Sequence, residues 1–159
     1  MILLGIDPGL QVCGYAAIRV ENGKEQLLEA GVIRTDAGKP LETRLNQIAQ
    51  DFDSLLRKFR PQVLAVEQLY SHYKHPRTAI LMGHARGVIL RQAAAAGAEI
   101  KSFSATRIKK SLTGSGKAGK AQMQRAIQSA LGLARIPEPP DVADAVAAAL
   151  CCANERGIF

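Results

Sequence analysis

Short apolar segments recur along this chain, each bounded by turn residues and too short to be a buried helix. The first stops at Asp7-Pro8-Gly9, a sequence typical of a strand that ends in a turn. The Asn22-Gly23 pair favours a tight hairpin, so the second and third strands are expected to run antiparallel. The predicted strands are residues 2–6, 12–20, 27–33, 63–66 and 100–103.

Helical periodicity fills the intervals between and after these strands. Apolar residues from Leu41 to Phe59 recur at steps of three and four, which marks an amphipathic helix. The predicted helices are residues 41–59, 77–96, 107–112 and 121–134, with a last helix starting near Asp141 after a proline-rich connector. This order predicts an α/β fold in which a mixed sheet carries an antiparallel hairpin. We expect one domain over residues 1–159.

Acidic residues interrupt this apolar pattern where a buried segment would not tolerate an unpaired charge. Asp7 and Glu67 each follow a predicted buried strand, and Asp144 stands in a nearly all-apolar helix, so it is expected to be buried. Asp141 lies three residues earlier and faces the same way. Because ligand sites form beyond the carboxyl ends of strands in α/β sheets, we expect all four acids to meet at that edge.

Four converging carboxylates repel one another unless cations neutralise them, and hard oxygen ligands select Mg²⁺ or Mn²⁺ over zinc. Two such ions can stabilise the attacking and leaving oxygens of a phosphodiester. Each acid also has an ordinary interpretation, which is weakest for Asp144. Asp7 is a common turn residue, Asp141 favours a helix amino terminus, and Glu67 could pair with an arginine in the core. The combination of all four is more specific than any member.

The chain carries a net charge of +7, which favours a polyanionic partner such as nucleic acid. Two segments are candidate DNA contacts, although solvated surface charge is the alternative for each. The first follows Glu67 and mixes aromatic rings with cations, and the second is a lysine-bearing loop. Their candidate residues are Tyr70, Tyr73, Lys74, Arg77, Lys109, Lys110, Lys117 and Lys120. Arg86 and Arg91 fit a surface role and a DNA contact equally well.

Other motifs exclude some function classes. The segment 114–120 matches a phosphate-binding loop, but no buried strand precedes it and Ala121 lacks the hydroxyl that holds magnesium, so we reject an ATPase. Three cysteines, two of them adjacent, imply no disulfide framework and indicate a reducing cytosol. No apolar stretch approaches the length of a membrane span, and a cytoplasmic location is expected.

Three segments together resemble the RuvC family of bacterial Holliday junction resolvases. They are Gly5-Ile6-Asp7-Pro8-Gly9, Val66-Glu67-Gln68 and Asp141-Val142-Ala143-Asp144-Ala145, and the similarity extends over essentially the whole chain. The resemblance implies an RNase H-like fold with a five-stranded mixed sheet flanked by helices. It also implies a homodimer that cuts two opposed strands of a four-way DNA junction.

By the same resemblance, the family's four catalytic and metal-binding acids correspond to Asp7, Glu67, Asp141 and Asp144. Its stacking aromatic corresponds to Tyr70, and its two functional lysines to Lys120 and to either Lys109 or Lys110. Two Mg²⁺ ions per site are implied, with Mn²⁺ as a substitute, and a branch-migration motor as partner. Two other functions stay open: a module that binds branched DNA without cutting it, and an actin-like or sugar-kinase-like phosphotransferase.

Overall fold

A five-stranded mixed sheet forms the centre of the molecule in the computed structural model, which describes residues 1–70 and 75–155. Its strands are β1 (Ile2–Asp7), β2 (Val12–Glu21), β3 (Lys24–Arg34), β4 (Val63–Glu67) and β5 (Glu99–Phe103). They lie in the order β3-β2-β1-β4-β5. The first three are antiparallel neighbours, whereas β4 and β5 run parallel to β1. The predicted mixed sheet is therefore confirmed.

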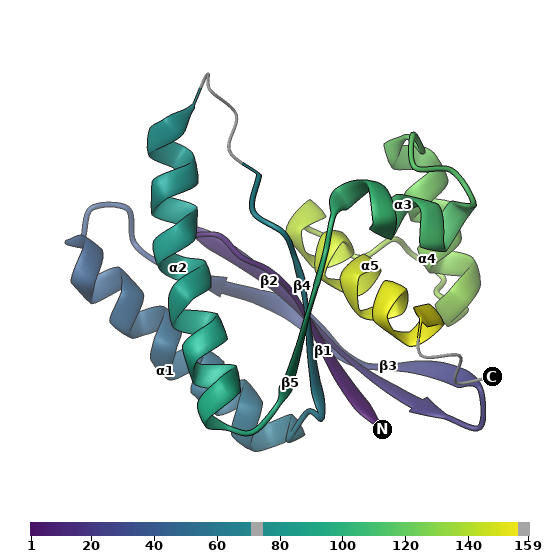
Figure 1. Cartoon of the computed structure of the whole chain (residues 1–159), viewed down its shortest axis with the longest axis horizontal. Coiled ribbons are helices and arrows are strands. Elements are labelled where there is room, and N and C mark those ends of the chain that lie inside the picture. Colours follow the sequence, from purple (N-terminus) through teal and green to yellow (C-terminus); the bar gives the residue numbers. More distant parts are fainter. Residues whose placement is uncertain (71–74, 156–159) are drawn as a thin grey trace.

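Helices cover both faces of this sheet (Figure 1). They are α1 (Leu41–Phe59), α2 (Pro76–Ala95), α3 (Ala105–Thr113), α4 (Lys120–Leu131) and α5 (Pro140–Glu155). The first two pack on one face and the last three on the other. None of the helices in the described ranges is long and apolar enough to cross a membrane.

Most predicted boundaries agree with the structure to within two residues, but α4 is shorter than expected. The sequence predicted helix through Ala134, whereas α4 ends at Leu131 because Gly132 adopts a left-handed conformation with φ of 61°. The predicted hairpin turn is confirmed, since Asn22 and Gly23 both have positive φ.

Helix α5 is the most deeply buried helix of the fold. Ten of its sixteen residues are buried, and it packs against β1, β2 and β4. Its alanines let it lie close to the sheet, while Val142, Val146 and Leu150 supply bulk to the core. The two cysteines of this helix, together with Cys13, are buried free thiols, as the sequence predicted. Residues on α5 are consequently held in a fixed position relative to the sheet.

Candidate active site

Two of the predicted acids end neighbouring parallel strands. Asp7 is the last residue of β1 and Glu67 the last of β4, and the residues before them, Ile6 and Val66, are register partners. Both strands leave the sheet at the same edge. The sequence pattern of an apolar run followed by an acid therefore places two carboxylates side by side at the carboxyl end of the sheet.

Glycines on the sheet bring α5 and its acids to this edge. A Cβ atom at Gly5 would lie 2.0 Å from the carbonyl oxygen of Ala145, and Gly14 similarly adjoins the helix at Asp141. Any side chain at either position would push the helix outward. The sequence alone did not assign this role to the two glycines, although a glycine within a strand is a recognised signal of close backbone approach.

Asp144 differs from the sequence prediction because its side chain is exposed rather than buried. The helix around it is apolar, but Asp144 and its neighbour Ala143 line a hollow between the helices, where Asp144 reaches solvent. Asp7, Glu67 and Asp141 are partly buried. The four acids thus lie at the boundary between the core and an accessible surface.

The four carboxylates influence one another's ionisation. Burial, followed by repulsion from Asp144, Asp141 and Glu67, raises the pKa of Asp7 from 3.8 to about 7. Burial and the charge of Asp144 raise the pKa of Glu67. Although Asp144 is exposed at the surface, partial loss of its hydration beside the apolar hollow, followed by the charge of Asp141, raises the pKa of its carboxyl group. None of the ion pairs within the described ranges includes one of these acids. The edge therefore holds an excess of negative charge.

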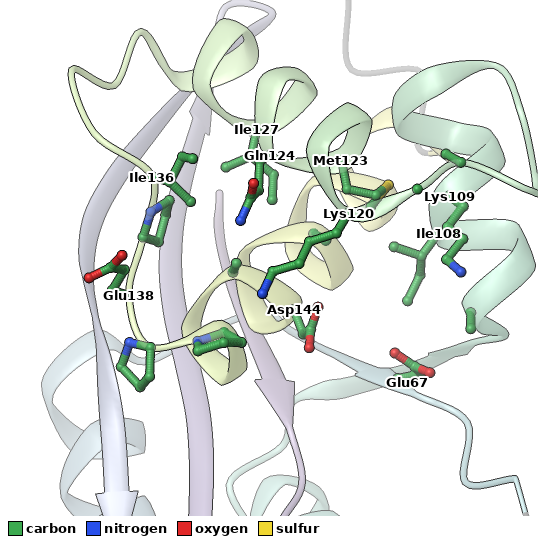
Figure 2. A pocket seen from close by; sticks show the side chains of 18 residues that line it. Glu67, Ile108, Lys109, Lys120, Met123, Gln124, Ile127, Ile136, Glu138 and Asp144 are labelled. Atoms are coloured by element: carbon green, nitrogen blue, oxygen red, sulfur yellow. The ribbon is translucent and has the colours of Figure 1, made fainter.

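Two lysines oppose this negative charge without forming ion pairs with it. Lys109 on α3 lowers the pKa of both Glu67 and Asp144, and Lys120 at the start of α4 lowers that of Asp144. In Figure 2 the Lys120 side chain extends from α4 towards Asp144, and Lys109 lies on the side of Glu67. Lys110 is exposed and is not among the residues that line the hollow. Of the two adjacent lysines, only Lys109 reaches the acids.

These lysines line a hollow of about 850 Å³ between α3, α4, α5 and the proline-rich connector (Figure 2). Glu67 and Asp144 line it as well. Its interior is largely apolar, lined by Ile108, Met123, Ile127, Ile136 and several alanines and prolines. The sequence did not predict this hollow, because its walls come from separate segments whose apolar residues resemble core residues.

A smaller hollow of about 230 Å³ opens on the other side of Glu67. Asp7, Glu67 and Tyr70 line it, together with Met82 and Arg86 of α2. The Tyr70 side chain is 81% exposed, which is unusual for a large ring and suits a residue that contacts a partner. Glu67 therefore separates a lysine-bearing hollow from one that carries an aromatic ring.

Divalent cations fit the chemistry of this edge. No three His, Cys, Asp or Glu side chains within residues 1–70 and 75–155 are spaced to share one ion. Magnesium, however, is commonly held by one or two carboxylates, with water and substrate phosphate completing its coordination. Four mutually repelling carboxylates that lack ion pairs supply such a partial set. Zinc sites usually include nitrogen or sulfur ligands from His or Cys, which these four acids do not supply.

The remaining predicted DNA contacts lie around this site or outside the described residues. Arg77, in the first turn of α2, and Lys117, in the loop before α4, are exposed and line neither hollow. Tyr73 and Lys74 fall outside the described residues. The segment 114–120 follows helix α3 rather than a buried strand, which agrees with rejecting the ATP-binding loop.

Comparison with known proteins gives consistent relatives over nearly the full chain. A family model described as crossover junction endodeoxyribonuclease RuvC matches residues 3–152. The crossover junction endodeoxyribonuclease RuvC of Rhodopirellula baltica is 48% identical over 94% of this chain and 84% of its own length. The RuvC structure from Thermus thermophilus superposes with a TM-score of 0.92 at 32% identity, covering 99% of this chain and 96% of that one. A second structure, T. thermophilus RuvC in complex with Holliday junction substrate, gives a TM-score of 0.92 at 31% identity and covers 98% and 94% of the two chains.

Proposed function

Because the chain belongs to the RuvC family of crossover junction endodeoxyribonucleases, we propose that its acidic edge cuts two opposed strands of a four-way DNA junction. The observation that carries this proposal is the electrostatic coupling of Asp7 to Glu67, Asp141 and Asp144, which come from two strand ends and one helix. Such a concentration of negative charge in a chain of net charge +7 suits metal-dependent chemistry on a bound polyanion.

The four acids are the catalytic residues of this proposal and would hold two Mg²⁺ ions, for which Mn²⁺ can substitute. When bound, the ions supply Lewis-acid stabilisation of the negative charge that develops on the phosphodiester. The protein's own contribution is to fix the acids on β1, β4 and α5 and to limit water around Asp7 by partial burial. The positions of Lys109 and Lys120 beside the acids support a role in holding the scissile phosphate.

Contacts farther along the DNA involve the segment after Glu67 and the lysine-bearing loop. Tyr70 is proposed to stack on a base at the crossover, where an aromatic face contributes about 1–3 kcal/mol. Its exposure and its place beside Asp7 and Glu67 support that role. The other proposed contacts with the DNA backbone are Tyr73, Lys74, Arg77, Lys110 and Lys117.

A homodimer is the proposed working form. Each copy of the chain, as one nuclease domain of residues 1–159, offers one acidic edge, whereas symmetric resolution requires two strands to be cut. A two-fold dimer would place one site on each opposed strand. The bacterial relatives support a cytoplasmic location. The family resemblance supports binding to a branch-migration motor.

The deciding experiment compares a synthetic four-way junction with a linear duplex of the same sequence, each incubated with and without Mg²⁺. Paired nicks in the junction alone, only when Mg²⁺ is present, are the expected result. Binding of the junction with no product under either Mg²⁺ or Mn²⁺ would favour the non-cleaving DNA-binding module instead. Turnover of ATP without DNA cleavage would favour the phosphotransferase.

A further inference from the structure

Arg86 of α2 is the cation that the smaller hollow presents beside the acids. The hollow is lined by Asp7 and Glu67, which end β1 and β4, by Tyr70, and by Arg86 and Met82 of α2. An aromatic ring, a cation and two catalytic acids thus share one small space. This combination resembles what a nucleotide needs, because a base can stack on the ring while its phosphate meets the cation.

The Arg86 side chain is held in place from the neighbouring strand. Its Nη2 donates a hydrogen bond of 3.1 Å to the hydroxyl of Ser102 on β5. Its Nε atom is buried and has no hydrogen-bond partner in the part of the chain that the structure describes. Arginine has five N–H donors in a planar fork, and the bond to Ser102 uses one of them, so the guanidinium keeps donors for a phosphate in the hollow.

The guanidinium of Arg86 is not paired with the acids. It forms no ion pair with any described residue, and the cations that lower the pKa of Glu67 and Asp144 are Lys109 and Lys120. Those lysines belong to the larger hollow, on the opposite side of Glu67. Positive charge is therefore available on both sides of the acidic edge, which is what a strand crossing that edge would require.

From these observations we propose that Arg86 binds a backbone phosphate of the substrate strand, forming with Tyr70 a nucleotide subsite next to the scissile phosphate. This inference rests on the proposed function. A strand that meets Lys109 and Lys120 on one side of the acids would meet Arg86 on the other. Ser102 then acts as a positioning residue, since it orients the guanidinium.

Arg91 provides a matched control on the same helix. Its side chain is exposed, donates a hydrogen bond to Gln92 and lines a groove between α1 and α2. The acids do not line that groove. From the sequence, a surface role and a DNA contact were equally good interpretations of both arginines. In the structure, only Arg86 lines a hollow together with the acids.

The test measures junction binding by the full chain without divalent metal, at a series of salt concentrations, in an Asp7→Asn background. Arg86→Gln is expected to weaken binding roughly tenfold, as for a charged hydrogen bond, and to reduce the slope of log affinity against log salt by about one. Arg86→Lys should keep the slope, and Arg91→Gln should keep both quantities. An unchanged salt slope in Arg86→Gln would overturn the proposal, because a purely structural role does not release counterions.

A second measurement covers the case in which Arg86→Gln fails to fold. The unsubstituted protein is treated with phenylglyoxal, which modifies arginines, with and without the junction and again without metal. Protection of Arg86 by the junction is expected, and equal modification in both conditions overturns the proposal. Neither measurement depends on strand cleavage. A failure of the Arg86 proposal is therefore distinguishable from a failure of the proposed nuclease function.

Discussion

Gly14 and Asp141 are in direct backbone contact: a Cβ atom added at Gly14 would lie 2.0 Å from the carbonyl oxygen of Asp141. This contact joins β2, the first strand of the β2–β3 hairpin, to the first turn of α5, the turn that carries Asp141 and leads to Asp144. With the similar contact at Gly5, it fixes how near the helical acids come to Asp7. The absence of a side chain at position 14 is therefore a requirement of the site as well as of the fold.

Substitution of Gly14 by alanine is expected to displace the start of α5 and to lower cleavage more than 100-fold, because a misplacement of about 1 Å at a reaction centre can have that effect. Overpacking should also cost about 1–3 kcal/mol of stability. Cleavage rate and urea unfolding measure the two effects. Gly38→Ala, whose Cβ would meet only the flexible Asp36 side chain, is the control. Full activity in Gly14→Ala would show that the acids tolerate a shift of α5.

Lys109→Ala and Lys110→Ala are expected to differ clearly in cleavage rate, although the two lysines are adjacent in the sequence. Lys109 lowers the pKa of Glu67 and Asp144 and lines the hollow beside them, whereas Lys110 points elsewhere and is exposed. Loss of Lys109 should reduce the cleavage rate about 10²-fold or more, as for removal of a group that stabilises developing charge. Lys110→Ala should reduce it only a few-fold, through weaker DNA binding. Single-turnover rates at saturating protein test the distinction, and equal losses in the two variants would contradict it.

The sequence predicted the strands well because continuous apolar runs and an Asn-Gly pair are strong local signals. It also placed Asp7 and Glu67 correctly, since both acids end neighbouring parallel strands. Asp144 was misjudged as buried because its neighbours are apolar. Ala143, Asp144 and Ala147 also line the hollow between the helices, so this side of the helix is reached by solvent at Asp144 although Ala147 itself is buried. Local pattern cannot distinguish an apolar face packed on a sheet from one that lines a cavity.

Choices between adjacent or similar residues also required three-dimensional information. Successive residues on a helix point about 100° apart, so only the position of α3 relative to the sheet decides which of Lys109 and Lys110 faces the acids. Arg86 and Arg91 also differ in their neighbours. Arg86 is hydrogen-bonded to Ser102 on β5, whereas Arg91 lines a groove between α2 and α1. The end of α4 depended on Gly132, a residue that the predicted helix had included.

Tyr70→Ala is expected to impair junction cleavage without destabilising the protein. The ring is 81% exposed, so its loss removes little buried area, while loss of stacking should weaken the junction complex by about 1–3 kcal/mol. Tyr70→Phe keeps the ring and should retain most of the activity. Junction cleavage and thermal unfolding are compared for the three proteins. A large drop in melting temperature for Tyr70→Ala would indicate a structural role instead.

The metal-free protein should lose stability as pH rises from about 4 to about 7. Burial and like charges raise the pKa of Asp7 from 3.8 to about 7, so the folded state binds this proton more tightly than the unfolded chain. The resulting stabilisation is complete below pH 3.8 and is lost as pH rises through about 7. It amounts to at most about 4 kcal/mol, at about 1.4 kcal/mol per pKa unit. Raised pKa values of Glu67 and Asp144 act in the same direction.

Asp7→Asn provides the control for this pH dependence and for catalysis together. The amide carries no charge at any pH, so urea unfolding in the presence of a chelator should show a smaller loss of stability between pH 5 and pH 8 than in the unsubstituted protein. Added Mg²⁺ should restore stability at pH 8 in the unsubstituted protein more than in the variant, because the cation offsets the same repulsion that protonation removes. The variant should still bind the junction while its cleavage is abolished. An identical dependence of stability on pH in the two proteins would mean that Asp7 is not the group whose raised pKa destabilises the folded state at high pH.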